Sequence, residues 1–364
     1  MHFVTGGFSG ATQVAIDLVD AALSSARTEP LLVLRRKPQT PRSRIDALKE
    51  RGMPVATVAS WPHALTVWQL VRLCRKFRPQ VLVAHGFSEH LWGRYAGLLA
   101  KVPALVHVEH NSRERYTPWR LAQARWLARR TARIVGVSEG VREQLLRLGF
   151  PQDRTVAIPN GIRLERFALA DEHPLEAREP GIVMAARFAK QKDHATLLQA
   201  IAVLKTRGWT PPVWLAGGGK PRHLEAARQL CHRLGLDGQV HFLGHCSDLP
   251  GLLMSQRICV LSTHYEGMPL SLVEGMAAGC AVVGTAVPGV RELIDHGHNG
   301  LLVPHEDPVA LADALCELLS DAAKASRLAR QGRQTALNRH GLDLMQRRYE
   351  TLFLALAGST SPHA

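Results

Sequence analysis

The strongest constraint on the fold of this chain is the alternation of short apolar runs with segments of helical periodicity. Runs such as QVLVAHG (80–86) and ALVHVEH (104–110) are each followed by a stretch with apolar residues at helical spacing. This alternation is typical of a parallel sheet whose strands are joined by helices, so we predict a doubly wound α/β architecture.

The same pattern starts again at GIVMAAR (181–187), after a connection at 159–180 that is rich in turn-forming and charged residues. We therefore predict two Rossmann-like domains, residues 1–165 and residues 166–342. Residues 343–364 are predicted to form a helix that is able to cross back onto the first domain, and then a disordered tail.

Composition is that of a soluble, cytoplasmic protein. Hydrophobic residues make up 46% and charged residues 21% of the 364 positions, and no apolar run reaches the roughly 18 residues of a membrane-spanning helix. The N-terminus runs directly into a strand-like segment, without the pattern of a signal peptide. The six cysteines are scattered and lack zinc-site spacing, so we expect reduced thiols and no metal.

Positive charge is concentrated in the first half of the chain. Residues 1–165 hold 25 Lys/Arg against 12 Asp/Glu, a net of +13, while residues 166–364 hold 20 against 19, a net of +1. Such a surface predicts an anionic partner, which can be a membrane surface, a phosphorylated lipid or a nucleic acid. Arginine on solvated faces, without a partner, is the alternative.

Segment 114–133 combines this charge with aromatic residues. Trp119 and Trp126 are seven apart, and several arginines surround them: Arg115, Arg120, Arg125, Arg129, Arg130 and Arg133. A basic helix of this kind can lie in a membrane interface. The alternative is that the tryptophans pack into the domain core and only the arginines are solvated.

The first strand leads into a glycine-rich turn with Gly6, Gly7 and Gly10, which would let the backbone approach a ligand closely. The order of these glycines is not the G-x-G-x-x-G dinucleotide fingerprint. Arg35 and Arg36 at the end of the next strand leave a phosphorylated dinucleotide as an open alternative.

Two histidines, His85 and His110, stand at the C-terminal ends of predicted strands. Ligands bind at that edge of open α/β sheets, so both are candidate site residues, and His110 is the stronger one because Asn111 follows it. A structural role in the core is the alternative for each.

Glu266 and Glu274 are eight residues apart in HYEGMPLSLVEGMAAGCAVVGT (264–285). Pro269 is predicted to be the first residue of a helix, whose free N–H groups, including those of Leu270 and Ser271, would form an anion site. Two solvated glutamates on a surface helix are the alternative.

Arg187 and Lys192 follow the first strand of the second domain, and Gly217–Gly219 follow its second strand. Together with the helix start near Pro269, these groups would neutralise a diphosphate and stabilise a leaving nucleotide. No acidic pair of the kind that holds a divalent ion accompanies them, so we expect a metal-independent site.

Four stretches of the second half occur in a recognisable order: RFAKQKDHATLLQA, WLAGGGKPRHLEAARQLCHRLGLDGQVHFLGH, HYEGMPLSLVEGMAAGCAVVGT and GVRELIDHGHNGLLVPHEDPVALADAL. They resemble successive motifs of retaining glycosyltransferase family 4 (glycosyl transferases group 1), which has the GT-B fold. Agreement covers about 180–320, and GGFSGATQVAIDL and IPNGIRLERF also fit. The resemblance implies an enzyme of bacterial surface-polysaccharide or lipopolysaccharide synthesis.

The resemblance implies a catalytic set of Glu266, His110, Arg187 and Lys192. Arg187 and Lys192 match the pair that binds the donor diphosphate, and Glu274 matches the glutamate that holds the donor ribose. Glu266 and His110 match the glutamate and histidine near the donor sugar.

The other residues that the resemblance places at the donor are mostly backbone contacts: Gly7, Gly217, Gly218, Gly267, Met268, Pro269 and Leu270. The turn GGFSGAT differs from the commoner GGAE-type sequence, which leaves the acceptor side open.

The implied activity is transfer of a sugar from a nucleotide-diphosphate sugar to a hydroxyl, with retention, in a cleft between the acceptor and donor domains. Front-face attack is the preferred route, and double displacement through Glu266 stays open. A saccharide or lipid-linked saccharide is the expected acceptor, with an anionic membrane surface as a further partner at the inner face of the cell membrane.

Two alternative functions stay open beside this one. A nucleotide-sugar epimerase of the same fold is the nearest enzyme. A basic nucleic-acid-binding protein is the rival from another class, but no recognisable RNA or DNA module is present, so no nucleic-acid partner is expected.

Overall fold

The computed structural model describes residues 1–38, 40–86, 89–112 and 116–358. The chain divides into two compact units: Met1–Asn160 together with the segment that begins at Leu342, and Gly161–Gly341. The predicted tail after Gly358 and Arg115 of the basic segment lie outside the described residues.

The first unit is built on a seven-stranded parallel sheet of order β3-β2-β1-β4-β5-β6-β7. Its strands are β1 (His2–Thr5), β2 (Leu32–Arg36), β3 (Val55–Ala59), β4 (Val81–His85), β5 (Ala104–Glu109), β6 (Arg133–Gly136) and β7 (Thr155–Ala157). Its helices are α1 (Gly10–Ser25), α2 (Arg42–Glu50), α3 (His63–Phe77), α4 (Glu89–Leu99), α5 (Pro118–Ala128), α6 (Glu139–Arg147) and α14 (Leu342–Gly358).

Side-chain alternation along the central strands of this sheet creates a core on each face. Phe3 packs with Leu70 and Cys74 of α3. Its neighbour Val4 packs with Ile16 and Val19 of α1 on the other face. The doubly wound arrangement therefore follows from strands that are apolar on both sides.

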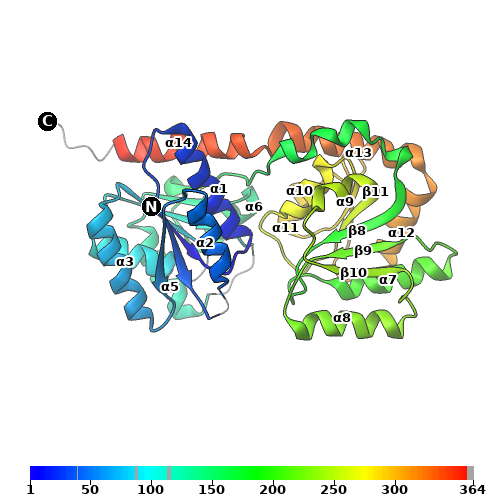
Figure 1. Ribbon diagram of the computed structural model, residues 1–364, viewed down its shortest axis with the longest axis horizontal. Helices are drawn as coiled ribbons and strands as arrows, with labels where there is room; N and C mark the ends of the chain where they lie inside the picture. Colours follow the sequence, from blue (N-terminus) through cyan, green and yellow to red (C-terminus); the bar gives the residue numbers. More distant parts are fainter. Residues whose placement is uncertain (39, 87–88, 113–115, 359–364) are drawn as a thin grey trace. The chain divides into compact units, whose positions relative to one another are not determined.

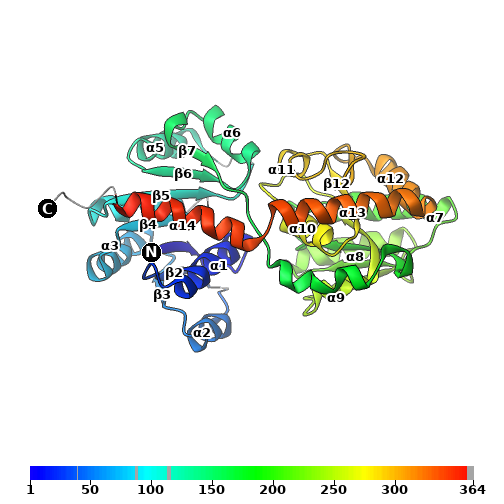
Figure 2. The same cartoon turned by 90° about the horizontal axis from the view of Figure 1, so that it is seen from above.

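Helix α14 is the last element of the first unit and packs beside α1 (Figure 2). Its buried face carries Met345 and Tyr349. The Gln346 amide donates to the Asp17 carbonyl over 3.1 Å, and Glu350 forms an ion pair with Arg27 at 3.3 Å.

The second unit contains a six-stranded parallel sheet of order β10-β9-β8-β11-β12-β13. Its strands are β8 (Glu179–Ala185), β9 (Val213–Ala216), β10 (Val240–Gly244), β11 (Gln256–Leu261), β12 (Ala281–Thr285) and β13 (Leu301–Val303). Its α-helices are α7 (His194–Thr206), α8 (Pro221–Arg233), α9 (Leu249–Ser255), α10 (Leu270–Ala277), α11 (Pro288–Arg291), α12 (Pro308–Ser320) and α13 (Ala322–Arg339). Short 3-10 segments, Gln152–Arg154, Leu164–Glu172 and Leu175–Ala177, complete the described elements.

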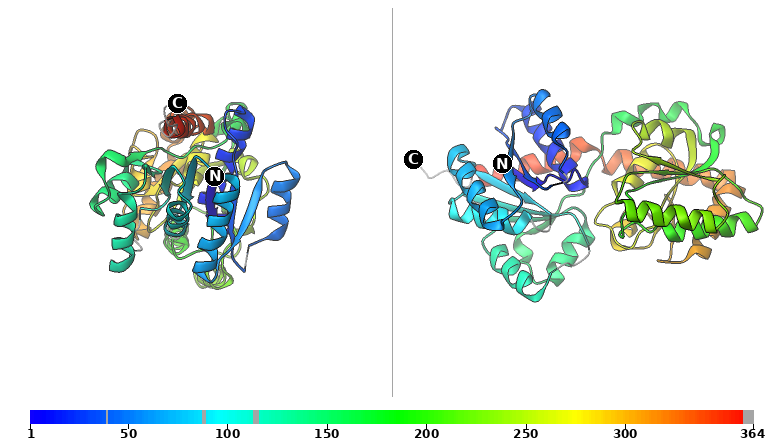
Figure 3. Two further views of the ribbon diagram at one scale, coloured as in Figure 1. Left: turned by 90° about the vertical axis from the view of Figure 1, so that its left-hand side faces the viewer. Right: turned by 60° about the horizontal axis from the view of Figure 1, so that its bottom comes forward.

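Two all-parallel sheets, each with helices on both faces, confirm the predicted α/β fold class (Figures 1 and 3). Several helices of the second unit begin at an aspartate that satisfies free N–H groups of the first turn. Asp193 accepts from the Thr196 N–H at 3.1 Å, and Asp307 accepts from the Ala310 N–H at 2.9 Å.

Two local predictions were wrong. Helix α5 ends at Ala128, not near 133, because the chain has to enter β6 at Arg133. Pro269 is the N-cap of α10, with an extended ψ of 99°, so the helix begins one residue later than predicted.

Candidate active site

The glycine loop after β9 packs backbone to backbone against the loop after β8. The Phe188 N–H donates to the Gly218 carbonyl at 2.8 Å, and the Gly217 N–H donates to the Gly244 carbonyl at 2.7 Å. A Cβ on Gly217 would overlap the Ala186 carbonyl, whereas a Cβ on Gly218 would meet nothing. Gly217 is therefore required by the approach of the two loops, and Gly218 leaves open space.

The two predicted cations, Arg187 and Lys192, have different environments. The Arg187 side chain is exposed and forms no hydrogen bond or ion pair with any described residue. Lys192 is largely buried, with 13% of its side chain exposed, and its ammonium is paired with Glu266. Arg187 is thus the freely available cation at this edge of the sheet.

Glu266 is a buried carboxylate, held in place from within its own unit. Its Oε1 accepts from the Lys192 ammonium and, at 2.9 Å, from the Thr263 hydroxyl. Thr263 is itself held, because its backbone N–H donates to the Thr285 hydroxyl at 3.1 Å. This anchoring orients Glu266 and balances its charge.

Helix α10 begins directly after this buried loop. Its N-cap residue, Pro269, has no side-chain cap, and within the described part of the chain the N–H groups of Leu270 and Ser271 make no hydrogen bond. Gly267, Met268 and Pro269 are buried. The helix therefore presents free N–H donors and its positive dipole end beside Glu266, as an anion site requires.

Glu274 lies on the body of α10, one helical turn from its start. Its Oε1 is 3.8 Å from the Arg166 guanidinium. Burial raises the pKa of the Glu274 carboxyl to about 7, and the Arg166 charge opposes that rise only in part. At neutral pH the Glu274 carboxyl is therefore a mixture of its protonated and its ionised form.

In the first unit, His85 and His110 lie together at the C-terminal ends of β4 and β5. His85 Nδ1 is 3.3 Å from His110 Nε2, and His2 Nδ1 is 3.1 Å from His85 Nε2, so three imidazoles form a line. Desolvation lowers the pKa of His110 to about 4 and that of His85 well below its usual value. Both rings are therefore neutral at pH 7 and act through hydrogen bonds.

Glu109 fixes the backbone around His110. Its buried carboxylate accepts from the backbone N–H groups of His110 and Asn111, at 2.9 and 3.2 Å. Its other oxygen is 3.6 Å from His107.

The glycine turn after β1 joins β1 to α1. A Cβ on Gly6 would meet the Arg35 carbonyl at 2.9 Å, so this glycine is required by contact with β2. Gly7 is exposed, with Thr5 Oγ1 3.6 Å from its Cβ position. No atom crowds this backbone position, and its role at the donor stays a prediction.

Arg35 is not available for the 2′-phosphate of a dinucleotide. It is buried and paired with Glu89 at 3.2 Å, and it also donates to the Ser60 carbonyl at 3.1 Å. Of the two arginines behind the dinucleotide alternative, only Arg36 is exposed.

Trp119 and Trp126 do not pack into the core of the first unit. Trp119 is 75% exposed and Trp126 46% exposed. Trp126 lies beside Tyr95, with ring centroids 6.2 Å apart, and the Arg130 guanidinium lies 3.9 Å above its ring. The alternative of buried tryptophans is therefore wrong.

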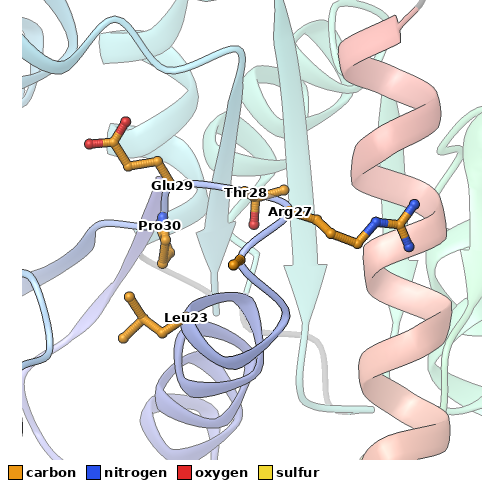
Figure 4. A pocket seen from close by; sticks show the side chains of 6 residues that line it. Leu23, Arg27, Thr28, Glu29 and Pro30 are labelled. Carbon is orange, nitrogen blue, oxygen red and sulfur yellow. The ribbon is translucent and has the colours of Figure 1, made fainter.

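The hollow drawn in Figure 4 is a shallow depression at the C-terminal end of α1, lined by Leu23, Ala26, Arg27, Thr28, Glu29 and Pro30. It contains none of the predicted site residues and lies at the opposite edge of the sheet from the strand ends that carry His85 and His110, so we do not regard it as the active site. Within the described residues, no helix has the length and apolar character needed to cross a bilayer.

Sequence reasoning missed three groups that support the site. Thr263 orients Glu266, Arg166 faces Glu274, and Gly289 packs so closely on the Glu266–Gly267 backbone that a Cβ would overlap the Gly267 carbonyl. Arg166 lies within the quoted IPNGIRLERF stretch, so a signal was present for it. No sequence signal marked Thr263, because its role depends on its hydrogen bond to Glu266 in the folded chain.

The fold and the site of the second unit define a class. Comparison with solved structures gives the same fold: HepE of Anabaena, solved with UDP-glucose, superimposes with a TM-score of 0.83 at 22% identity, over 97% of this chain and 99% of HepE. Two parallel-sheet domains of this kind are those of a GT-B glycosyltransferase.

Family models make the assignment specific. Residues 8–166 match the model described as Glycosyltransferase Family 4, and residues 179–321 match Glycosyl transferases group 1. The chain belongs to glycosyltransferase family 4, which confirms the resemblance seen in the sequence.

The relatives include a glycosyltransferase of lipopolysaccharide core biosynthesis and a putative glycosyltransferase. The lipopolysaccharide core biosynthesis glycosyltransferase LpsE of Rhizobium meliloti is 28% identical over 92% of this chain and 92% of its own length. EpsD of Bacillus subtilis is 29% identical over 58% of each chain. The chain thus matches little more than half of EpsD and nearly all of LpsE.

Proposed function

We propose that this glycosyltransferase transfers a hexose from a nucleotide-diphosphate sugar to a hydroxyl of a bacterial surface glycan, with retention and without a metal. The second unit binds the donor. The observation that carries the proposal is the grouping of a free cation, Arg187, with the open N–H groups at the start of α10 and the two carboxylates Glu266 and Glu274.

Each donor moiety has a matching group in this arrangement. Arg187 and the N–H groups of Leu270 and Ser271 provide charge and donors for the diphosphate. Glu274 accepts from the ribose hydroxyls. The backbone at Gly217 and Gly218 lies close by on the neighbouring loop, and UDP is the first donor nucleotide to test because HepE was solved with UDP-glucose.

We favour front-face attack over a covalent intermediate. Oε1 of Glu266 accepts from Lys192 and Thr263 within a buried loop, an arrangement that suits a carboxylate that orients the sugar. We assign Glu266 to orientation of the donor sugar. His110, neutral and hydrogen-bonded to His85, is assigned to a contact with the same sugar.

The test combines binding with product analysis. Calorimetry with UDP, GDP and ADP identifies the nucleotide, and proton NMR of the transferred sugar gives its anomeric configuration. Retention in the product, with full activity in EDTA, supports the proposal. An inverted product, or epimerisation of the donor without an acceptor, overturns it.

The acceptor part of the proposal is a lipid-linked saccharide reached through the α3–α5 side of the first unit. Four tryptophans are exposed there or at the adjoining loop: Trp61, Trp68, Trp119 and Trp126. Helices α3, α4 and α5 are successive neighbours. The net charge of +13 in residues 1–165 adds attraction to anionic lipid, about 1 kcal/mol for each Lys or Arg near the surface.

Vesicle sedimentation tests this part separately. We expect binding to phosphatidylglycerol vesicles at low salt, weaker binding at high salt, and loss in the double variant Trp119→Ala/Trp126→Ala. Leu337→Ala removes an exposed apolar side chain from the second unit and serves as control. Equal binding of the tryptophan variant and the control would refute membrane contact through α5.

A further inference from the structure

Two loops of the second unit bring three metal-binding side chains together. His264 lies between β11 and α10, and His305 and Glu306 lie between β13 and α12. His264 Nδ1 is 2.8 Å from His305 Nε2 and 3.2 Å from Glu306 Oε1, and His305 Nε2 is 3.9 Å from the same oxygen. The potential ligand atoms of these three side chains all lie within 4.8 Å of one another.

These separations fit a first coordination shell. Zinc lies about 2.0–2.2 Å from imidazole nitrogen and carboxylate oxygen, so tetrahedral ligand atoms are about 3.3 Å apart. The three observed separations, 2.8, 3.2 and 3.9 Å, lie on both sides of that value. His264 is half-buried and the other two residues are exposed, so small side-chain rotations are free to correct the difference.

We propose that His264, His305 and Glu306 bind one divalent ion of the zinc class and so connect the two loops. Two imidazoles and one carboxylate are a donor set that zinc prefers to magnesium or calcium, whose ligands are oxygens. The fourth position faces solvent and takes water. The ion is not needed for sugar transfer, so this proposal does not rest on the proposed function.

The backbone around the cluster shows what the ion would hold. The His264 N–H donates to the Gln191 carbonyl at 2.9 Å, and the Lys192 backbone pairs with Thr263. On the other loop, Asp307 follows Glu306 directly and caps α12. An ion between His264 and His305 therefore ties the loop that leads to Glu266 to the start of α12, without contacting the Glu266 carboxylate.

Zinc and cobalt alone are the probes. The full chain, stripped with EDTA and exchanged into chelator-free buffer, is titrated with Zn²⁺ by calorimetry and with Co²⁺ by visible absorption, which is strong for four-coordinate cobalt. We expect one ion per chain and a melting temperature that rises with Zn²⁺ concentration, because the ion binds the folded state.

Three variants decide the assignment. His264→Ala and His305→Ala are each expected to weaken Zn²⁺ binding at least about tenfold, since even a residue that only supports a ligand often costs that much. His232→Ala is the matched control, because it removes an exposed imidazole that pairs with Asp237 at 3.0 Å in the same unit. Its Zn²⁺ affinity should equal that of the wild type.

Equal Zn²⁺ affinity in the wild type, His264→Ala and His305→Ala would overturn the proposal, as would an equal loss in the control. Melting temperatures in EDTA identify a folding defect, and if His264→Ala fails to fold, the exposed pair His305→Ala and Glu306→Gln carries the test. UDP binding measured in EDTA reports on the donor site independently.

Discussion

Replacing Lys192 by methionine tests the central feature of the donor unit, the buried pair with Glu266. The side chains are 13% and 7% exposed, so the variant leaves a carboxylate in a poorly solvated place without its counter-charge. Breaking one partner of a buried pair typically costs 3–5 kcal/mol. The Thr263 hydroxyl still donates to Glu266 at 2.9 Å in the variant, so we expect a cost at the lower end of this range, about 3 kcal/mol.

The double variant Lys192→Met/Glu266→Gln is expected to recover most of that loss. The neutral amide needs no counter-charge and keeps the Thr263 hydrogen bond, so the stability should return to within about 1 kcal/mol of the wild type. The difference from simple addition of the two single variants is the coupling energy. Its magnitude is at least about 2 kcal/mol, because the Lys192→Met loss alone exceeds the double-variant loss by that amount and any cost of Glu266→Gln adds to it.

Calorimetric melting in EDTA is the assay. For a unit of this size, a loss of 3 kcal/mol corresponds to a fall of about 6–12 °C in the melting temperature. Lys190→Met is the control, because Lys190 is exposed two residues away. A fall no larger than the control's, or additive single variants, would refute the view that Lys192 chiefly balances the charge of Glu266.

Three further predictions concern the donor site. Arg187→Ala should leave the melting temperature unchanged but weaken UDP binding by about 10–100-fold, measured by calorimetry, because a charge-assisted contact is worth about 1.5–3 kcal/mol. For Glu274, whose pKa is about 7, we expect UDP affinity to fall about tenfold from pH 8 to pH 6 as the carboxylate is protonated, with a flatter profile in Glu274→Gln. Gly217→Ala should destabilise the second unit, seen as a lower melting temperature, because its Cβ overlaps the Ala186 carbonyl, whereas Gly218→Ala should not.

The fold was predictable from the sequence because parallel strands buried on both faces appear as apolar runs. Such runs can be recognised without knowing which residues contact each other. The edges of the first sheet were harder. β3 and β7 were missed, along with α2, because VATVA is only partly buried and β7 is three residues long. Short edge strands carry little periodicity to detect.

The sequence names the residues of the candidate site but not their charge states or partners. The motif spacing indicated that Lys192 and Glu266 serve the donor, and the structure adds that they are paired with each other. The pKa of Glu274 likewise depends on burial and on Arg166, which is distant in sequence. The charge state and the ion-pair partner of a side chain depend on contacts between residues that are distant in sequence. A motif within one stretch of sequence does not contain that information.

Pairing also explains how a diphosphate site can contain two glutamates. The Lys192 ammonium balances Glu266, and the raised pKa of Glu274 leaves that carboxyl only partly ionised at pH 7. The charges that remain are Arg187, Arg166 and the positive end of α10. The fold sets Lys192 against one carboxylate and Arg166 beside the other, so the local field at the start of α10 is favourable to an anion although the formal count of charged residues in the second half is nearly balanced.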